Sequence, residues 1–341
     1  MTESADIPHT INARCPRCGY DLRGEIATWT EACPLFGRCT ECGLDLAWGD
    51  VLDPRGRPRW NIEYAHGLGR TAMALPFTAA LSFLPRYFWR RLCMTLEPRW
   101  RRLAFYVGVW FLVCHLSMGA GSAAVAGSQW SLYASASELS MLDDQVAVMV
   151  RAFILPYSSG PMLRYRFKVI RHPSQQGVHT RPLDSWFAPL LKRLHPAALL
   201  LALFTVALPA SFVTLPVSRR QARVRWRHLA RIFTYGLLFP ALAFIGMIAI
   251  AATAYLSAPG WSRPSVDPDL ARVHLVVIAA ALMLALWWWC AIRWFLRMSQ
   301  PGRVGLSVVG VAMMFALAAT YIVYPDAVTR LISRILFPLG A

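Results

Sequence analysis

Long apolar runs separated by short polar segments dominate the chain after residue 102. A helix that crosses the roughly 30 Å hydrocarbon layer of a membrane needs about 20 apolar residues, because each residue rises about 1.5 Å. The pattern therefore predicts a transmembrane helix wherever such a run occurs. Five stretches reach this length without any Asp, Glu, Lys or Arg: 103–127, 196–217, 232–256, 273–292 and 304–324.

Two further apolar patterns lie near the ends of these stretches. Residues 71–84 are apolar but number only 14 and include Pro76. This segment can be an interfacial helix, a re-entrant helix or an abbreviated span, and we favour the interfacial helix. The run Trp287–Trp289, near the end of the fourth long stretch, is predicted to lie in the headgroup layer, where Trp is enriched.

Composition agrees with a membrane protein. Of the 341 residues, 56% are apolar and 16% are charged, whereas about 25% are charged in an ordinary soluble domain. The mean hydropathy is +0.41. These values exclude a disordered chain, a coiled coil, a collagen and a typical soluble enzyme. The predicted fold class is an all-α polytopic membrane protein.

The net charge of +17 arises from arginines that lie beside the apolar stretches. Residues 67–102 hold seven Arg and one acid, and residues 218–231 hold six Arg and no acid. Such clusters mark the cytoplasmic side of a membrane protein. We therefore expect a multi-pass protein of the cell (cytoplasmic) membrane with its N-terminus in the cytoplasm and Ala341 outside. No apolar leader is visible in the first 66 residues, so the first span is expected to act as the insertion signal.

Aromatic residues are interleaved with these arginines. The basic-aromatic belts are 85–92, 98–104, 225–230 and 293–297. Trp and Arg suit the headgroup layer, and an Arg near anionic lipid gains about 1 kcal/mol. The belts are expected to anchor the helices and to contact anionic lipids.

The long loop at 128–195 is predicted to lie outside the cytoplasm. Residues 162–171 partly alternate between basic and apolar side chains, which is the period of a half-exposed strand. A short amphipathic helix is expected at 186–194, leading into the second span. Together these elements predict a small extra-cytoplasmic α/β excursion.

Five of the eight cysteines fall between positions 15 and 42, and four of them form two knuckles. The pattern C-x2-C-x20-C-x2-C has the spacing of a four-thiolate zinc site. Two intervening residues let a tight turn aim both sulfurs at one ion, and the glycine after each knuckle tolerates positive φ. We predict structural zinc, since a four-thiolate shell leaves no open position for substrate. The predicted ligands are Cys15, Cys18, Cys39 and Cys42.

Other uses of these cysteines remain open at this point. A pair of disulfides would require the N-terminus outside, and a redox CxxC is a further alternative. Two knuckles at this spacing favour metal. Cys33 can in principle replace one ligand, but its distance from Cys39 fits no knuckle, so we expect a bystander thiol.

The segments Cys15-Pro-Arg-Cys18-Gly-Tyr-Asp-Leu-Arg-Gly24 and Cys39-Thr-Glu-Cys42-Gly-Leu44 resemble the zinc-ribbon head of uncharacterised bacterial multi-pass membrane proteins. This resemblance covers about the first 50 residues. The overall plan is similar to the Yip-type five-helix family, which is associated with membrane trafficking and organisation. The resemblance implies an integral membrane protein and supplies no catalytic residue.

These observations predict a modular chain: a zinc ribbon at 1–60, a basic-aromatic segment at 61–102, a transmembrane domain at 103–324 and a tail at 325–341. The leading hypothesis is a non-enzymatic membrane organiser or adaptor with a protein partner at the ribbon. A small transporter or channel component is the alternative. A membrane enzyme is a third hypothesis, but the sequence contains no cluster of acid, base or nucleophile to support it. Nucleic acid is not expected, because residues 1–66 carry ten acids and seven arginines.

Overall fold

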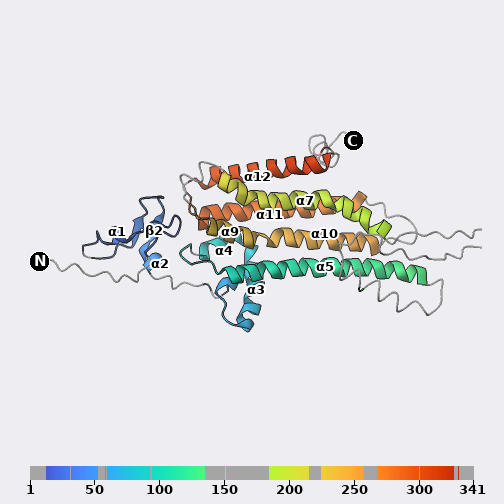
Figure 1. The fold of residues 1–341 in the computed structure, drawn as a ribbon, viewed down its shortest axis with the longest axis horizontal. Coiled ribbons are helices and arrows are strands. Elements are labelled where there is room, and N and C mark those ends of the chain that lie inside the picture. Colours follow the sequence, from blue (N-terminus) through green and yellow to red (C-terminus); the bar gives the residue numbers. More distant parts are fainter. Residues whose placement is uncertain are drawn as a thin grey trace, which may run out of the picture. The chain divides into compact units, whose positions relative to one another are not determined.

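The computed structural model describes residues 13–30, 32–52, 58, 60–92, 94–134, 150, 184–214, 224–256, 267–298, 300–325 and 329. This part of the chain is mostly helical and includes one two-stranded sheet (Figure 1). The backbone forms two compact units, each described by itself below. Unit 1 comprises Met1–Val107, Phe204–Leu238 and Leu282–Phe315, and unit 2 comprises Gly108–Leu203, Phe239–Ala281 and Ala316–Ala341.

Five helices are long and apolar enough to cross a membrane, which confirms the prediction from hydropathy. Their apolar segments are Trp100–Ala124, Pro196–Val213, Trp226–Thr253, Arg272–Phe295 and Pro301–Val323. The elements that carry them are α5 (Trp100–Ala134), α7 (Asp184–Thr214), α9 (Trp226–Gly236) with α10 (Leu238–Leu256), α11 (Asp267–Cys290) with the π-helical η4 (Ala291–Phe295), and α12 (Pro301–Val323).

The third of these helices begins at Trp226, within the arginine cluster, whereas the sequence predicted a start at residue 232. His228 and Arg231 are buried in α9 and contact other parts of unit 1. The helix therefore extends through polar residues because the protein, and not lipid, surrounds them. A boundary drawn only from apolar residues misses this turn and a half of helix.

Unit 2 is held together by small aliphatic side chains. One buried cluster joins α7, α10 and α11. Small residues let helix backbones approach closely, which favours helix association in a membrane. The buried members are Ala197, Leu201, Ala243, Met247, Ala251, Val273, Val277 and Ala280.

Unit 1 has an aromatic core instead. Phe88 and Trp89 of α4 (Pro85–Arg91) pack on Trp287 with ring centroids 4.9 and 4.7 Å apart. Trp287 also donates its Nε1–H to the carbonyl of Ile232 at 3.0 Å. Trp287 and Trp288 are fully buried, so their rings contact protein, whereas the headgroup position predicted for them stays a prediction. The side chains of α4 cover this end of α11, which periodicity within α11 does not reveal.

In helix α3 (Leu68–Ser82), polar side chains are buried and large apolar side chains are exposed, which is the opposite of the usual arrangement in a soluble protein. Its buried side includes Thr71, Thr78 and Ser82, while Met73 and Phe77 are exposed. Thr78 donates to the carbonyl of Trp60 at 3.1 Å and accepts from the N–H of Ile62 at 3.0 Å. At 15 residues α3 spans only about 22 Å, less than the hydrocarbon layer. Polar groups turned inward and apolar groups turned outward are typical of a helix in contact with lipid.

Several predictions concern segments that are only partly described. The expected strand at 162–171 and most of the loop 128–195 lie outside the described residues, as does most of the 325–341 tail. The helix expected at 186–194 is part of α7, which runs without a break from Asp184 to Thr214.

Candidate metal centre and the contacts that hold it

The two cysteine knuckles have the same backbone geometry. The N–H groups of Cys15 and Cys39 donate to carbonyls five residues further on, at 2.8 and 2.9 Å. The N–H groups of Gly19 and Gly43 return to the carbonyls of Cys15 and Cys39, both at 2.8 Å. Gly19 and Gly43 have φ values of +81° and +65°, which confirms the positive φ predicted for them.

These turns bring four sulfurs together. The Sγ atoms of Cys15, Cys18, Cys39 and Cys42 all lie within 4.8 Å of one another. The pairs Cys15–Cys42 and Cys18–Cys39 are separated by 3.6 and 3.8 Å. A disulfide requires about 2.05 Å, so these cysteines are unbonded thiols. A tetrahedron with metal–sulfur bonds of about 2.3 Å has edges of about 3.8 Å, so the group can hold a metal ion.

The electrostatics of the sulfurs favour a cation among them. The hydrogen bond to Cys42, together with burial, raises the pKa of the Cys15 thiol far above its ordinary value. Burial raises the pKa of Cys18 to about 11 and also raises that of Cys39. The hydrogen bond from Cys15 lowers the pKa of Cys42 to about 5. Four thiolates in so small a volume would require a cation to offset their charge, and a metal ion can supply it.

A small core fixes the positions of the knuckles. In the knuckle module (residues 13–52), strand β1 (Phe36–Arg38) pairs antiparallel with β2 (Asp45–Ala47). Trp48 lies beneath this hairpin in α2 (Trp48–Leu52), and its ring contacts that of Trp29 edge-on at 4.8 Å. Apart from the cysteines, the other buried hydrophobic side chains of the module are Ala13, Leu22, Leu44, Leu46 and Val51. So few apolar residues stabilise a module weakly, and bound metal would supply much of its folding free energy.

Cys33 lies apart from the four sulfurs. Its side chain is exposed, and its Sγ lies 3.4 Å from the carbonyl oxygen of Pro34. Within the described part of the chain, the four-cysteine group is the one set of three or more potential ligands close enough for a metal ion.

Arg17, between the two cysteines of the first knuckle, joins the module to the residues that directly follow η4. Its Nε and Nη2 donate to the carbonyl of Leu296 at 3.1 and 2.7 Å, and Nη2 also donates to the carbonyl of Arg297 at 2.7 Å. Nη1 donates to the carbonyl of Cys42 at 3.1 Å. A guanidinium suits these carbonyls because the last ones of a helix lack intrahelical donors and carry partial negative charge. The buried Arg17 therefore couples the cysteine turns to a membrane-spanning helix.

Helix α9 contacts the same knuckle. The Nε2 of His228 lies 2.7 Å from the carbonyl oxygen of Pro16. Since a carbonyl only accepts, Nε2 carries the proton. The guanidinium of Arg225 occupies the space where a Cβ on Gly19 would lie. Glycine at this position thus permits both the positive φ and the close approach of Arg225.

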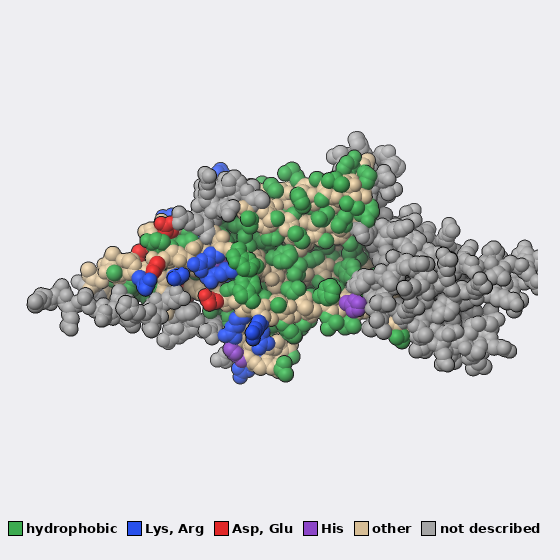
Figure 2. Space-filling view, in the orientation of Figure 1, with side chains coloured by type: hydrophobic (Ala, Val, Ile, Leu, Met, Phe, Trp, Pro, Cys, Tyr) green, Lys and Arg blue, Asp and Glu red, His purple; other side chains and the backbone are tan. Residues whose placement is uncertain are grey.

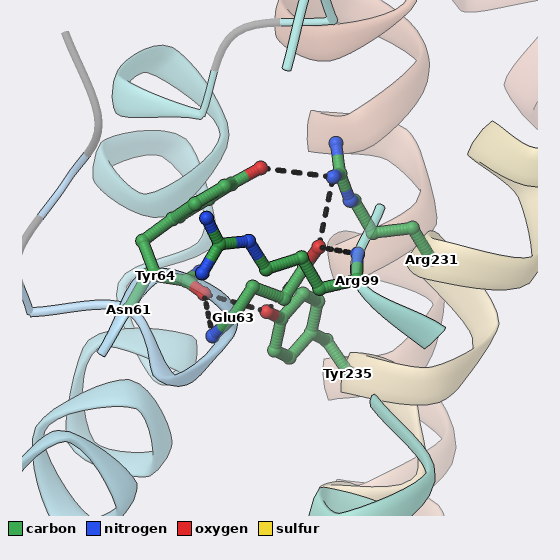
Figure 3. Close-up of polar contacts among 6 residues, drawn as sticks. All are labelled: Asn61, Glu63, Tyr64, Arg99, Arg231 and Tyr235. Atoms are coloured by element: carbon green, nitrogen blue, oxygen red, sulfur yellow. Dashed lines mark hydrogen bonds and ion pairs between the residues drawn. The ribbon is translucent and has the colours of Figure 1, made fainter. Parts of the chain in front are cut away.

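A second polar group is buried in unit 1 and surrounds Glu63 (Figure 3). Glu63 belongs to η1 (Ile62–Tyr64), and its Oε2 accepts from Arg231 Nη2 at 2.8 Å and from the backbone N–H of Arg99 at 3.2 Å. The hydroxyl of Tyr235 lies 2.8 Å from Glu63 Oε1 and 2.8 Å from Asn61 Oδ1. Its single hydrogen serves one of these two acceptors at a time.

Both charged side chains of this cluster are 0% exposed. Arg231 Nη2 also donates to the hydroxyl of Tyr64 at 3.0 Å, and burial raises the pKa of that hydroxyl. The cluster is sealed from solvent and so suits a structural role: it fastens the segment before α3 to α9. A buried pair of this kind holds its partners strongly in place, because removal of either charge leaves the other without compensation.

Sequence reasoning found the four cysteines and missed the Glu63 cluster. The sequence places Arg231 only in the 218–231 arginine cluster that marks the cytoplasmic side, and it indicates no role for Glu63. One signal was present: Glu63 is the sole acid between Asp53 and Glu97, and it stands between Ile62 and Tyr64. Arg231 and Tyr235 are also four residues apart, on one face of a helix.

Comparison of the chain with protein-family models, with curated proteins and with solved structures finds no match.

Proposed function

We propose that this protein is a non-enzymatic membrane organiser or adaptor, in which a structural zinc ribbon presents a surface to a partner protein. The observation that carries the proposal is the fixation of the four-cysteine module on a membrane-spanning helix through Arg17. A module that is held in this way on one side can bind a partner with its other side.

Zinc is the metal that the ligand set favours. Four thiolates at tetrahedral spacing suit Zn²⁺, and such a shell is closed to substrate. The role of the ion is then to stabilise the knuckles and the position of Arg17. The arginine clusters support a cytoplasmic position for this module, in the cell (cytoplasmic) membrane. A reducing cytoplasm would also keep the cysteines available as thiolates.

The partner surface that we favour is the β1 side of the module. Leu35 and Phe36 are 80% and 75% exposed. Neighbouring large apolar side chains at the surface of a small module mark a site of protein contact. Phe36 is the first residue of β1 and pairs with Ala47, the last residue of β2, at the end of the hairpin away from its turn.

The charges of the module favour a protein over nucleic acid. Of its four arginines, Arg17 is buried against helix carbonyls and Arg23 pairs with Asp21. Arg14 and Arg38 are left, together with several carboxylates on the same module. Affinity for nucleic acid comes largely from cations that neutralise phosphates, and two arginines supply little of it.

Photocrosslinking in intact membranes tests this proposal. A photoreactive residue replaces Phe36 in the full chain, and the control places it at Thr28, which is exposed on the same module. We expect a discrete protein adduct from position 36, none from position 28, and loss of the adduct on Cys39→Ser. Equal adducts from both positions, an adduct that survives Cys39→Ser, a nucleic-acid adduct or no protein adduct at position 36 would each contradict it.

A further inference from the structure

Three arginine side chains converge on one indole ring in unit 1. The Cζ atoms of Arg90, Arg293 and Arg86 lie 3.8, 5.1 and 5.4 Å from the centroid of the Trp294 ring. Arg86 and Arg90 stand one turn apart on the exposed side of α4, and Arg293 and Trp294 belong to η4. The aromatic core of unit 1 holds α4 and η4 together beneath them, so the convergence is built into the fold.

The described residues place no ion-pair partner beside these positive charges. Among the described residues, none of the three guanidiniums has a carboxylate within ion-pair distance. Asp45 and Asp50 line a pocket together with Arg90 and Trp294, but neither Arg86 nor Arg293 lines it. An indole face attracts cations without neutralising them. A bound anion would supply the negative charge that the described residues do not place beside these guanidiniums.

The backbone beside this cluster departs from regular helix. Residues Ala291–Phe295 are π-helical, and Arg297 has a φ of +48°, which is uncommon for a residue with a side chain. π-Helical turns within α-helices occur frequently at functional sites. Here the π-helical turn sets the positions of Arg293 and Trp294 opposite α4.

We propose that Arg86, Arg90 and Arg293, arranged around Trp294, bind the phosphate of an anionic phospholipid headgroup. A guanidinium matches phosphate oxygens with two parallel N–H groups, and three of them can surround one phosphate. The inference deepens the membrane part of the proposed function. It does not depend on the partner of the cysteine module, so either can fail alone.

The neighbouring surface indicates lipid as the source of the phosphate. Phe83 and Leu84, which directly precede α4, are 48% and 58% exposed. Met73 and Phe77 of α3 are exposed as well. In Figure 2, basic side chains gather next to hydrophobic side chains on the helical surface. Acyl chains would contact the apolar residues while the headgroup reaches the arginines, as in basic headgroup sites of other membrane proteins.

Native mass spectrometry of the purified full chain, with added phosphatidylglycerol or phosphatidylcholine, tests the site. The site variant is Arg86→Gln/Arg90→Gln/Arg293→Gln. The matched control, Arg14→Gln/Arg70→Gln/Arg303→Gln, removes the same charge from exposed arginines elsewhere in unit 1, outside the basic-aromatic belts. We expect retention of phosphatidylglycerol over phosphatidylcholine, about a hundredfold weaker retention in the site variant, and little change in the control.

The single change Arg86→Gln replaces one exposed side chain and is the least disruptive to the fold. It should weaken the retention of phosphatidylglycerol about fivefold. Equal losses in site and control variants would overturn the proposal, since they would indicate only general charge attraction. Unchanged binding in Arg86→Gln and in the site variant would overturn it too. Displacement of the lipid by inorganic phosphate would identify free phosphate as the ligand and would reject the lipid headgroup.

Discussion

Two buried polar groups in unit 1 contrast in how the chain builds them. The most distant of the four clustered cysteines, Cys15 and Cys42, are 27 residues apart, and two local turns aim their sulfurs. Glu63 and Arg231 are 168 residues apart and meet only because α9 packs against η1. The first group is complete within one small module, and the second exists only in the folded helices. Disruption of the cysteine group should therefore unfold only its module, whereas disruption of the Glu63 group should destabilise the packed helices.

Removal of the metal should give the largest effect and should be confined to the cysteine module. Binding of structural zinc contributes on the order of 10 kcal/mol in small modules, so chelation should unfold residues 13–52. Hydrogen exchange should then become fast at Leu22, Leu44 and Leu46, whereas exchange in α10 and α11 stays slow. Simultaneous loss of protection in the spanning helices would show that the two groups are not independent.

Loss of the Glu63 carboxylate should destabilise the helices. The change Glu63→Gln leaves the buried Arg231 without a counter-charge and should lower the free energy of unfolding by about 3–5 kcal/mol. Thermal unfolding in detergent measures it. The double change Glu63→Gln/Arg231→Met should recover part of the loss, because no charge then stays buried.

Glu97 provides the matched control for this prediction. It pairs with Arg227 at 3.5 Å, and its side chain is 79% exposed. The change Glu97→Gln should alter stability by less than about 1 kcal/mol. Equal effects of the Glu63 and Glu97 changes would refute the structural role of the buried pair.

Arg17 links the two regions and should have an intermediate effect. The change Arg17→Gln removes charge-assisted hydrogen bonds to Leu296 and Arg297 and should cost about 2 kcal/mol. Protease cleavage of the module should accelerate while metal remains bound. Arg14→Gln, at an exposed position of the same module, should leave both measurements unchanged.

The knuckle glycines should show the smallest effect of the series. Gly43 has a φ of +65°, so Gly43→Ala should destabilise the module by about 1–2 kcal/mol. Gly49, in α2, has open space around its Cβ position and ordinary φ, so Gly49→Ala should be neutral or stabilising. Chelator titration of the two variants compares them, and a lower metal affinity in Gly49→Ala would contradict the explanation.

The sequence predicted the five apolar helices and the cysteine group because each depends on local spacing. Run length identifies a span, and C-x2-C with a following glycine identifies a knuckle. The burial of Trp287 and the pairing of Glu63 with Arg231 depend on contacts between distant segments. A single sequence contains the participants but does not specify which of them meet. The inverted polarity of α3 was similarly hidden, since Thr71 and Thr78 face inward only through their partners.

Metal content of the purified full chain tests the central claim, a structural zinc centre held by two knuckles. The wild-type chain and Cys33→Ser should each contain about one zinc, whereas Cys39→Ser should contain none, because loss of one thiolate opens the tetrahedral shell. Zinc that persists in Cys39→Ser, or that disappears in Cys33→Ser, would contradict the ligand assignment, and a wild-type chain isolated without any zinc would contradict the metal centre itself.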